Sequence, residues 1–485
     1  MKSLRVAAAL VCAGLISACS FAPEYNRPDL PVPEQFADTT ASADSIQADW
    51  WTLFGDTTLN ALVEEALANN QDLAAAAARV EQARAIAGVA KSALYPEINV
   101  QGSGSRTQIP GTQFAPGSGA ENPFNSFDLL GTISYELDFW GKLRNANKAA
   151  RNEMLATEEG RRNVELTLIS DVITTYFDLL SLDRQLAISR ATLESRQEAV
   201  RLQTLRYEAG SISQLDLSQA QAELASTEAT VPVFERQMRA AENLLAVLLG
   251  RLGGSVARGE NGDRIDAIAS PEVPVGLPSE LIARRPDVMS AEFAMIGANA
   301  NIGTARAAYL PSIALTGYGG WQSDDLSRLI TQDTDVWQAS VGVFQTIFAP
   351  GRTQRQVDLA WGLYRETLAN FIRSVQVAFA DVDDALVARR TNLLIRQAED
   401  REVAARQTAQ DLSQIRYDAG ESSYLEVLDA QRQLFQAQLL RAEARRSELA
   451  ASVQLFKALG GGWETEEQMK ARMRMAGEEP EDRGR

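Results

Sequence analysis

Reactive side chains are scarce in this chain of 485 residues, and their placement limits the chemistry it could do. The sequence contains no His, which removes the commonest general base and a frequent metal ligand. Its two cysteines, Cys12 and Cys19, both lie within the first twenty residues. We find no phosphate-binding Gly-rich loop leading to Lys-Ser or Lys-Thr. We therefore expect no catalytic site, no cofactor and no metal.

The residues before Cys19 predict a covalent modification of this cysteine. A basic start and a short apolar stretch over 6–16 are typical of a secretory signal, here 1–18, which is too short to span a membrane. Leu15-Ile16-Ser17-Ala18-Cys19 resembles a lipobox, in which the cysteine becomes the acylated first residue. An ordinary signal with an incidental cysteine is the alternative. Ser20, where an Asp would favour retention at the inner membrane, suggests delivery to the outer membrane.

The chain after the signal contains an internal sequence repeat. Arg206-Tyr207-Glu208-Ala209-Gly210 returns as Arg416-Tyr417-Asp418-Ala419-Gly420, an offset of 210 residues (416 less 206). Further upstream, Tyr95-Pro96 matches Leu310-Pro311 at an offset of 215 (310 less 95). A period this long is unlike the few tens of residues of a solenoid, so it indicates two copies of one large unit.

Composition sets the expected limits of these two repeats. We place the first repeat at 49–255 and the second at 256–463. A Pro-rich, extended and lipid-anchored linker, 19–48, precedes them and is not expected to pack. The highly charged tail, 464–485, is expected to be disordered.

Each repeat is predicted to contain a helix, a β-hairpin, a very long helix and a return helix. The first helix begins at Asp56 and continues to about Ala93. Alternation of apolar and polar residues predicts strands at 97–101, 132–137, 312–316 and around 341–343. Proline is absent from 141–208 and 351–418, which predicts two rods of roughly 100 Å at 1.5 Å per residue. Return helices follow over 213–249, interrupted at Pro232, and over 423–459.

Four strands per chain are too few for a closed membrane barrel, because single-chain barrels have at least eight. An open edge cannot face lipid, so several chains must share one barrel. The predicted fold is therefore mainly α with a membrane β-barrel: a trimeric 12-stranded barrel, four strands per chain, that continues into a long α-helical tunnel. The formal charge of −17 argues against nucleic acid as a partner. Because strand pairs alone do not exclude a soluble hairpin, a periplasmic coiled-coil scaffold lipoprotein remains an alternative.

Several motifs together resemble the TolC-type outer membrane factors. The motifs are Trp50-Trp51-Thr52-Leu53-Phe54-Gly55-Asp56, Leu277-Pro278-Ser279-Glu280-Leu281, Arg284-Arg285-Pro286-Asp287 and the two Tyr-x-Ala-Gly tips. Cys19 followed by Pro23, Tyr25 and Pro28 is similar to the lipoprotein (NodT-type) branch, which serves multidrug efflux pumps.

The resemblance implies a passive exit duct in the outer membrane of a Gram-negative bacterium. A homotrimer would project through the periplasm. An inner-membrane transporter of the resistance-nodulation-division (RND) type would supply its small-molecule cargo through a periplasmic adaptor protein. A type I protein-secretion duct is the alternative within transport.

The resemblance also implies a periplasmic gate just inside the tip. The acidic ring of the family falls on Asp429, where three copies would narrow the bore and repel anions. Tyr417 matches a tyrosine that helps to hold the tip shut. Glu426 is either part of this gate or the capping-box partner of Ser423. The first repeat has Gln219 at the position of Asp429, so one ring per trimer is expected.

The turns at the two tips are the candidate contacts for the adaptor. These residues are Gly210, Ser211, Ile212, Gly420, Glu421 and Ser422. The two glycines also suit a left-handed residue that ends a helix, which is a structural role. Ser422 replaces a basic residue that belongs to the closed tip in some relatives.

Overall fold

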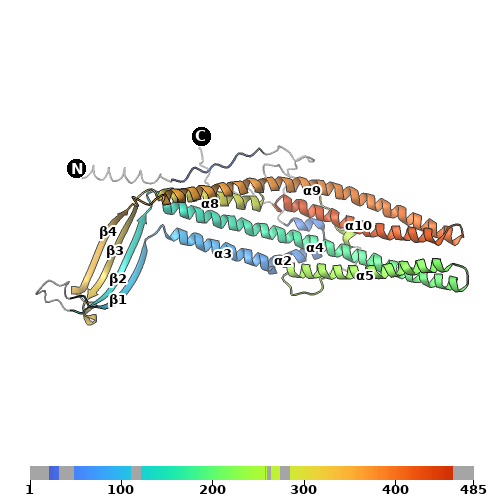
Figure 1. Ribbon diagram of the computed structural model, residues 1–485, viewed down its shortest axis with the longest axis horizontal. Coiled ribbons are helices and arrows are strands. Elements are labelled where there is room, and N and C mark those ends of the chain that lie inside the picture. Colours follow the sequence, from blue (N-terminus) through green and yellow to red (C-terminus); the bar gives the residue numbers. More distant parts are fainter. Residues whose placement is uncertain are drawn as a thin grey trace.

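The computed structural model describes residues 21–31, 49–110, 122–256, 258, 264–273 and 284–462. The predicted signal, Cys19, most of the linker and the predicted tail lie outside these residues. Figure 1 shows an elongated molecule with a β-sheet at one end and long helices that run from it to two helical tips.

One antiparallel sheet contains all four predicted strands, in the order β1-β2-β3-β4. The strands are β1 (Glu97–Thr107), β2 (Phe124–Leu137), β3 (Ser312–Ser323) and β4 (Asp335–Phe344). The two hairpins join where β2 pairs with β3, and Leu130 lies opposite Gly320 there. β1 and β4 are left as the two edges of the sheet.

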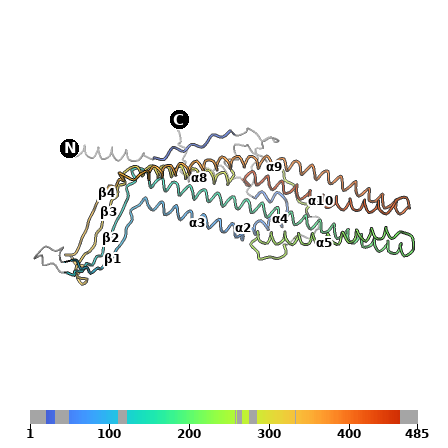
Figure 2. Tube along the Cα trace, viewed as in Figure 1, coloured from blue at the N-terminus to red at the C-terminus, as the bar shows by residue number. Residues whose placement is uncertain are grey.

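Six of the described helices form three pairs of equal length. They are α3 (Gln71–Ser92) and α8 (Pro286–Ala307) of 22 residues, α4 (Lys142–Glu208) and α9 (Arg352–Asp418) of 67, and α5 (Gln214–Leu248) and α10 (Tyr424–Ala458) of 35. In Figure 2 the chain can be followed through α3, α4 and α5 and then through their equivalents α8, α9 and α10. Among the described helices, none is long and apolar enough to cross a membrane.

The sheet obeys the same offsets as the sequence. Val100 of β1 lies opposite Gly131 of β2. Adding 215 to the first number and 210 to the second gives Leu315 and Val341, which lie opposite each other in β3 and β4. The two structural repeats are therefore confirmed down to the pairing of single residues.

The first predicted helix is wrong in one respect, because it is two helices. α2 (Thr57–Asn69) begins after Asp56, whose side chain accepts from the backbone N–H groups of the first turn. Asn70 then takes an extended conformation, with ψ 130°, and its side chain caps α3 by accepting from the N–H of Leu73 at 2.9 Å. Its amide also donates to the carbonyl of Leu248 at 2.9 Å. An asparagine that ends one helix, caps the next and binds a third explains the break.

The predicted interruption of the first return helix is also wrong. α5 runs continuously from Gln214 to Leu248 with Pro232 inside it. Proline removes one backbone donor from a helix and is usually disruptive there. In a helix of 35 residues the remaining hydrogen bonds maintain the helical path on both sides of it.

The core lies in the middle of the helical body and is built around the Trp-Trp motif. A 3-10 helix, η1 (Trp50–Phe54), inserts Trp50 and Phe54 with exposures of 1% and 0%. The ring of Trp50 stacks on Phe456 of α10 at 4.7 Å, and Phe54 meets Phe177 of α4 edge-on at 5.3 Å. The motif that carried part of the family resemblance is therefore a packing element that joins the two repeats.

The smaller elements lie between these. They are α6 (Arg264–Ala267), η3 (Leu326–Arg328) and η4 (Gln332–Thr334).

The described part of the predicted linker is extended, but it packs on the body, which corrects the expectation of an unpacked segment. We call residues 21–31 the strap. Tyr25 donates to the Glu292 carboxylate of α8 at 3.0 Å, and Arg27 pairs with the same group at 2.6 Å. Glu292 is only 6% exposed, so the strap provides the partners that a buried carboxylate needs.

Candidate functional site at the helical tips

Each tip begins where a rod ends in a glycine. Gly210 and Gly420 have φ of +72° and +75°, a left-handed conformation that other residues adopt at a cost. Behind them, the N–H of Ser211 bonds the carbonyl of Arg206 and the N–H of Glu421 bonds that of Arg416, both at 2.8 Å. These bonds satisfy the last carbonyls of each rod and reverse the chain.

The other residues of the two tips differ in exposure. Ser211 and Glu421 are exposed, whereas Ile212 and Ser422 are half-buried. The side chains of the first pair are therefore accessible at the surface of the tip.

The two return helices are capped differently, and the capping box that the spacing of Ser423 and Glu426 offered is not formed. Ser213 and Asp216 form a complete capping box, although an aspartate is the less usual partner. In the described structure Ser423 makes no side-chain cap bond. Glu426 instead pairs with Arg416 across the tip at 3.4 Å. The carboxylate of Glu426 is therefore used to hold α9 to α10.

Tyr417 lies at the contact between the two helical hairpins. Its phenol oxygen accepts hydrogen bonds from Arg206 at 3.2 Å and Gln203 at 3.3 Å, both on α4. The Arg206 guanidinium also lies over the Tyr417 ring at 5.5 Å, a cation–π contact, and pairs with Asp418 at 3.8 Å. The ring of Tyr424 packs against Tyr417 at 5.3 Å.

Arg206 and Gln203 were not identified as site residues from the sequence. Arg206 stood within the repeated motif, but so did its equivalent Arg416, which binds Glu426 instead. The repeat alone could not show which arginine crosses to the other hairpin.

Asp429 lies on α10 and is exposed. Its carboxylate accepts a hydrogen bond from Gln433, one turn further on, at 2.5 Å. Gln433 in turn accepts from Arg406 of α9. The neutral amide of Gln433 thus orients the carboxylate of Asp429, the residue predicted to form the acidic ring.

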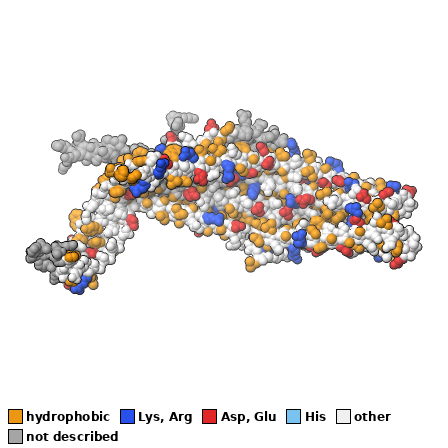
Figure 3. All heavy atoms as spheres, viewed as in Figure 1, with side chains coloured by type: hydrophobic (Ala, Val, Ile, Leu, Met, Phe, Trp, Pro, Cys, Tyr) orange, Lys and Arg blue, Asp and Glu red, His pale blue; other side chains and the backbone are white. Residues whose placement is uncertain are grey.

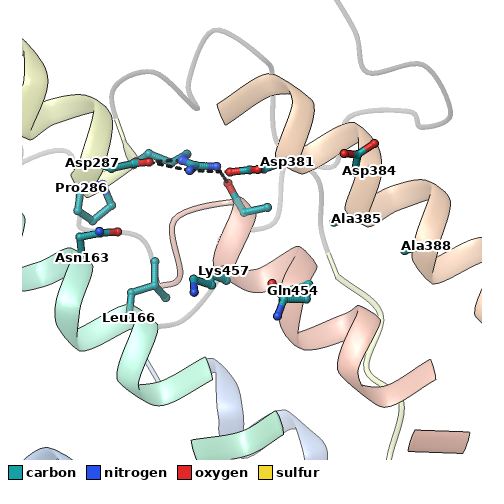
Figure 4. Close-up of a pocket in the computed structure, with 12 residues that line it drawn as sticks. Asn163, Leu166, Pro286, Asp287, Asp381, Asp384, Ala385, Ala388, Gln454 and Lys457 are labelled. Carbon is teal, nitrogen blue, oxygen red and sulfur yellow. Dashed lines mark hydrogen bonds and ion pairs between the residues drawn. The ribbon is translucent and has the colours of Figure 1, made fainter. Parts of the chain in front are cut away.

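A cavity of about 460 Å³ in the middle of the body contains a second concentration of charge (Figure 4). Arg285, 8% exposed, donates to Asp287 at 2.7 Å, to Asp381 at 2.9 Å and to the carbonyl of Ala458 at 3.1 Å. Burial disfavours the charged guanidinium, but the two carboxylates outweigh it and raise the pKa of Arg285.

The position of Arg285 gives the Arg-Arg-Pro-Asp motif a structural role. It ties the start of α8 to α9 and to the end of α10. Among the described residues, no group of three or more His, Cys, Asp or Glu side chains is placed to hold a metal ion.

Comparisons with known proteins agree with this geometry. The family model described as "Outer membrane efflux protein" matches the chain twice, at residues 62–251 and 277–461. The "Cation efflux system protein CusC" of Escherichia coli O6:H1 is 35% identical, over 93% of this chain and 97% of that relative. The "Probable outer membrane lipoprotein SilC" of Salmonella typhimurium is 34% identical, over 96% of this chain and 99% of that relative.

A solved structure shares the fold. The Campylobacter jejuni CmeC outer membrane channel superposes with a TM-score of 0.85 at 26% identity, covering 95% of this chain and 98% of that one. The predicted fold class, the efflux role and the outer-membrane location are therefore confirmed. The secretion duct and the scaffold, which the sequence left open, lose their support. The chain belongs to the outer membrane efflux protein family and is an outer membrane channel for efflux.

Proposed function

We propose that the chain forms a homotrimeric, passive exit duct of a tripartite efflux pump. It receives small molecules from an inner-membrane RND transporter through a periplasmic adaptor and carries out no catalytic step. The name of CusC refers to cations, but that describes CusC. The cargo of this chain is set by its own pump.

The proposal rests on a difference between two equivalent helices, α8 and α3. α8 lies between α4 and α9 and buries residues along its whole length, among them Val288, Phe293 and Ile302. α3, its equivalent, packs on α4 and buries only Ala76 and Val80. Among the described residues, no second long helix covers the other side of α3. α9 of a second copy would supply that cover, in the role that α4 plays for α8.

Exposed apolar side chains support the same pairing. On α3, Ile86 and Val89 are 64% and 71% exposed, and on α9, Leu359 is 63% exposed. Figure 3 shows apolar side chains gathered near the junction of the sheet and the helices, while charged ones are spread along the body. Burial of such apolar surface is the main driving force for association. The edge strands support it too, because β1 and β4 have unsatisfied backbone groups that a membrane would not tolerate.

Three copies close the ring with twelve strands and bring three Asp429 side chains together inside the tip. We propose that Asp429 forms the constriction of the periplasmic gate and that Tyr417 holds the tip closed. Glu426 supports that closed tip through its ion pair with Arg416. The turns that contain Gly210, Ser211, Ile212, Gly420, Glu421 and Ser422 are the proposed adaptor contacts.

We further propose that Cys19 is acylated after removal of residues 1–18. The lipobox pattern supports this, as does the name of SilC, a probable outer membrane lipoprotein. The strap supports it as well, because its first residue, Phe21, packs on Trp140 at 6.4 Å, close to the base of the sheet. An acyl chain two residues away would enter the membrane beside the barrel. The domain limits 49–255 and 256–463 remain part of the proposal.

The proposal is tested by the mass and conductance of the detergent-extracted protein. We expect three copies of the chain per particle and discrete channel openings in a planar lipid bilayer. A monomeric particle without channel activity would refute it.

A further inference from the structure

A buried cross-link joins α4 to α5 behind the first tip. Arg196, 7% exposed, pairs with the Glu223 carboxylate at 3.0 Å and donates to the Glu223 carbonyl at 2.8 Å. It also binds the hydroxyl of Thr227 and lies over the Phe435 ring of α10 at 5.7 Å. Burial lowers the pKa of Arg196, and Glu223 acts in the opposite direction. The arginine therefore depends on Glu223 for its charge compensation.

The second hairpin repeats this cross-link with one change. Adding 210 to 196 and to 223 gives Arg406 and Gln433, which are hydrogen-bonded between α9 and α10. The acid of the first hairpin is thus a neutral amide in the second. Gln433 lies one turn from Asp429 and donates to it, whereas a glutamate there would repel it.

Glu223 has a second partner, and that partner comes from the other hairpin. Arg432 of α10 forms an ion pair with the Glu223 carboxylate. Arg432 is also three residues from Asp429 on the same helix, a spacing at which opposite charges attract. The pKa of Arg432 is raised first by its hydrogen bond to Glu223, and Asp429 adds a smaller effect. Two carboxylates therefore compete for one guanidinium, and Glu223 holds it.

We propose that Glu223 is a positioning residue for the gate: by holding Arg432, it keeps the charge of Asp429 free to act on ions in the pore. This inference rests on the proposed gate role of Asp429. The Arg406–Gln433 pair orients the Asp429 carboxylate, and the Glu223–Arg432 pair prevents its neutralisation. Glu223 thereby determines the charge selectivity of the tip from the neighbouring hairpin.

The test is the cation-to-anion permeability ratio of the trimer, obtained from reversal potentials in a KCl gradient across a planar bilayer. Glu223→Gln removes the charge that holds Arg432. It also removes the ion pair of Arg196, which keeps its contacts with Thr227 and the Glu223 carbonyl. In this variant Arg432 pairs with Asp429 for part of the time. This pairing lowers the cation-to-anion permeability ratio by roughly twofold. Adding Arg432→Gln to Glu223→Gln restores the ratio, because no guanidinium is left to move.

A second background separates this effect from a simple change of net charge. In the Asp429→Asn channel, Glu223→Gln is expected to leave the ratio unchanged. An equal drop in both backgrounds would mean that Glu223 acts directly on ions, and would overturn the inference. So would a ratio that responds to Asp429→Asn but not to Glu223→Gln, in which case the gate role of Asp429 would stand alone. A ratio unaffected by Asp429→Asn would overturn both.

Discussion

Arg206, in the last turn of α4, donates a hydrogen bond to the phenol oxygen of Tyr417 in the last turn of α9, over 3.2 Å. The two residues belong to different repeats, and their contact joins the two helical hairpins at the tip. In the proposed gate, opening of the tip requires these hairpins to separate, and this contact would resist that movement.

Tyr417→Phe keeps the ring and removes the oxygen that accepts from Arg206 and Gln203. A hydrogen bond of this kind contributes about 1 kcal/mol, so the ratio of open to closed channels should rise by roughly fivefold. Single-channel recording measures this as the fraction of time spent open. Tyr207→Phe is the matched control, since Tyr207 is the equivalent residue of the first repeat and is 41% exposed. Equal open fractions in the two variants would show that Tyr417 does not hold the tip.

Asp429→Ala should raise the single-channel conductance, because it removes three side chains and three negative charges from the proposed constriction. Gln219→Ala, at the equivalent position of the first repeat, should leave the conductance as it is. If the aspartate variant conducts like the parent, Asp429 is not part of the constriction.

The docking of the strap can be tested with a pair of equivalent glycines. A Cβ at Gly303 of α8 would lie 2.7 Å from the backbone nitrogen of Ala22 and 2.5 Å from the Asn145 amide. At Gly88 of α3, which is 215 residues earlier, no described atom lies within 4 Å of that position.

Gly303→Ala should therefore displace the strap, with a loss of stability on the order of 1–3 kcal/mol, and chymotrypsin should cut faster after Tyr25. Gly88→Ala should be neutral or more stable by up to about 1 kcal/mol, because alanine favours the helix. Thermal unfolding and timed proteolysis measure both effects. Identical cleavage rates in the two variants would mean that the strap is not held at Gly303.

The sequence was most informative about the long elements. The rods predicted at 141–208 and 351–418 are the helices 142–208 and 352–418, because a glycine marks both ends and proline is absent between them. The offsets of 210 and 215 also predicted the arrangement of the hairpins, since β pairing follows the same repeat.

The sequence was less informative where a side chain could choose between partners. Asn70 carries no local signal that separates a helix interior from a double cap. Glu426 fits a capping box by spacing, yet an arginine across the tip is the partner it has. Tyr417 contacts Arg206 because α4 and α9 lie side by side at the tip. The sequence around either residue does not predict that contact.

The symmetry of the sheet also predicts how two copies meet. Leu130 lies opposite Gly320 where the repeats join within one chain. Adding 210 to 130 and subtracting 215 from 320 gives the equivalent positions, 340 and 105, on the edge strands β4 and β1. There Ser340 of β4 should lie opposite Ser105 of β1 in a neighbouring copy. Opposed residues of an antiparallel pair have Cβ atoms as little as about 4.5 Å apart, which a disulfide can span, whereas a diagonal neighbour at about 7 Å is too far.

The most direct test of the account is therefore disulfide cross-linking between copies. The variant Ser340→Cys with Ser105→Cys, oxidised in the membrane, should run as a covalent trimer on a denaturing gel. The control Ser340→Cys with Ser103→Cys, displaced by two residues on the same face, should remain monomeric. A monomer in both variants would contradict a barrel wall shared by three chains, and efficient cross-linking only in the displaced one would contradict the register that the symmetry predicts.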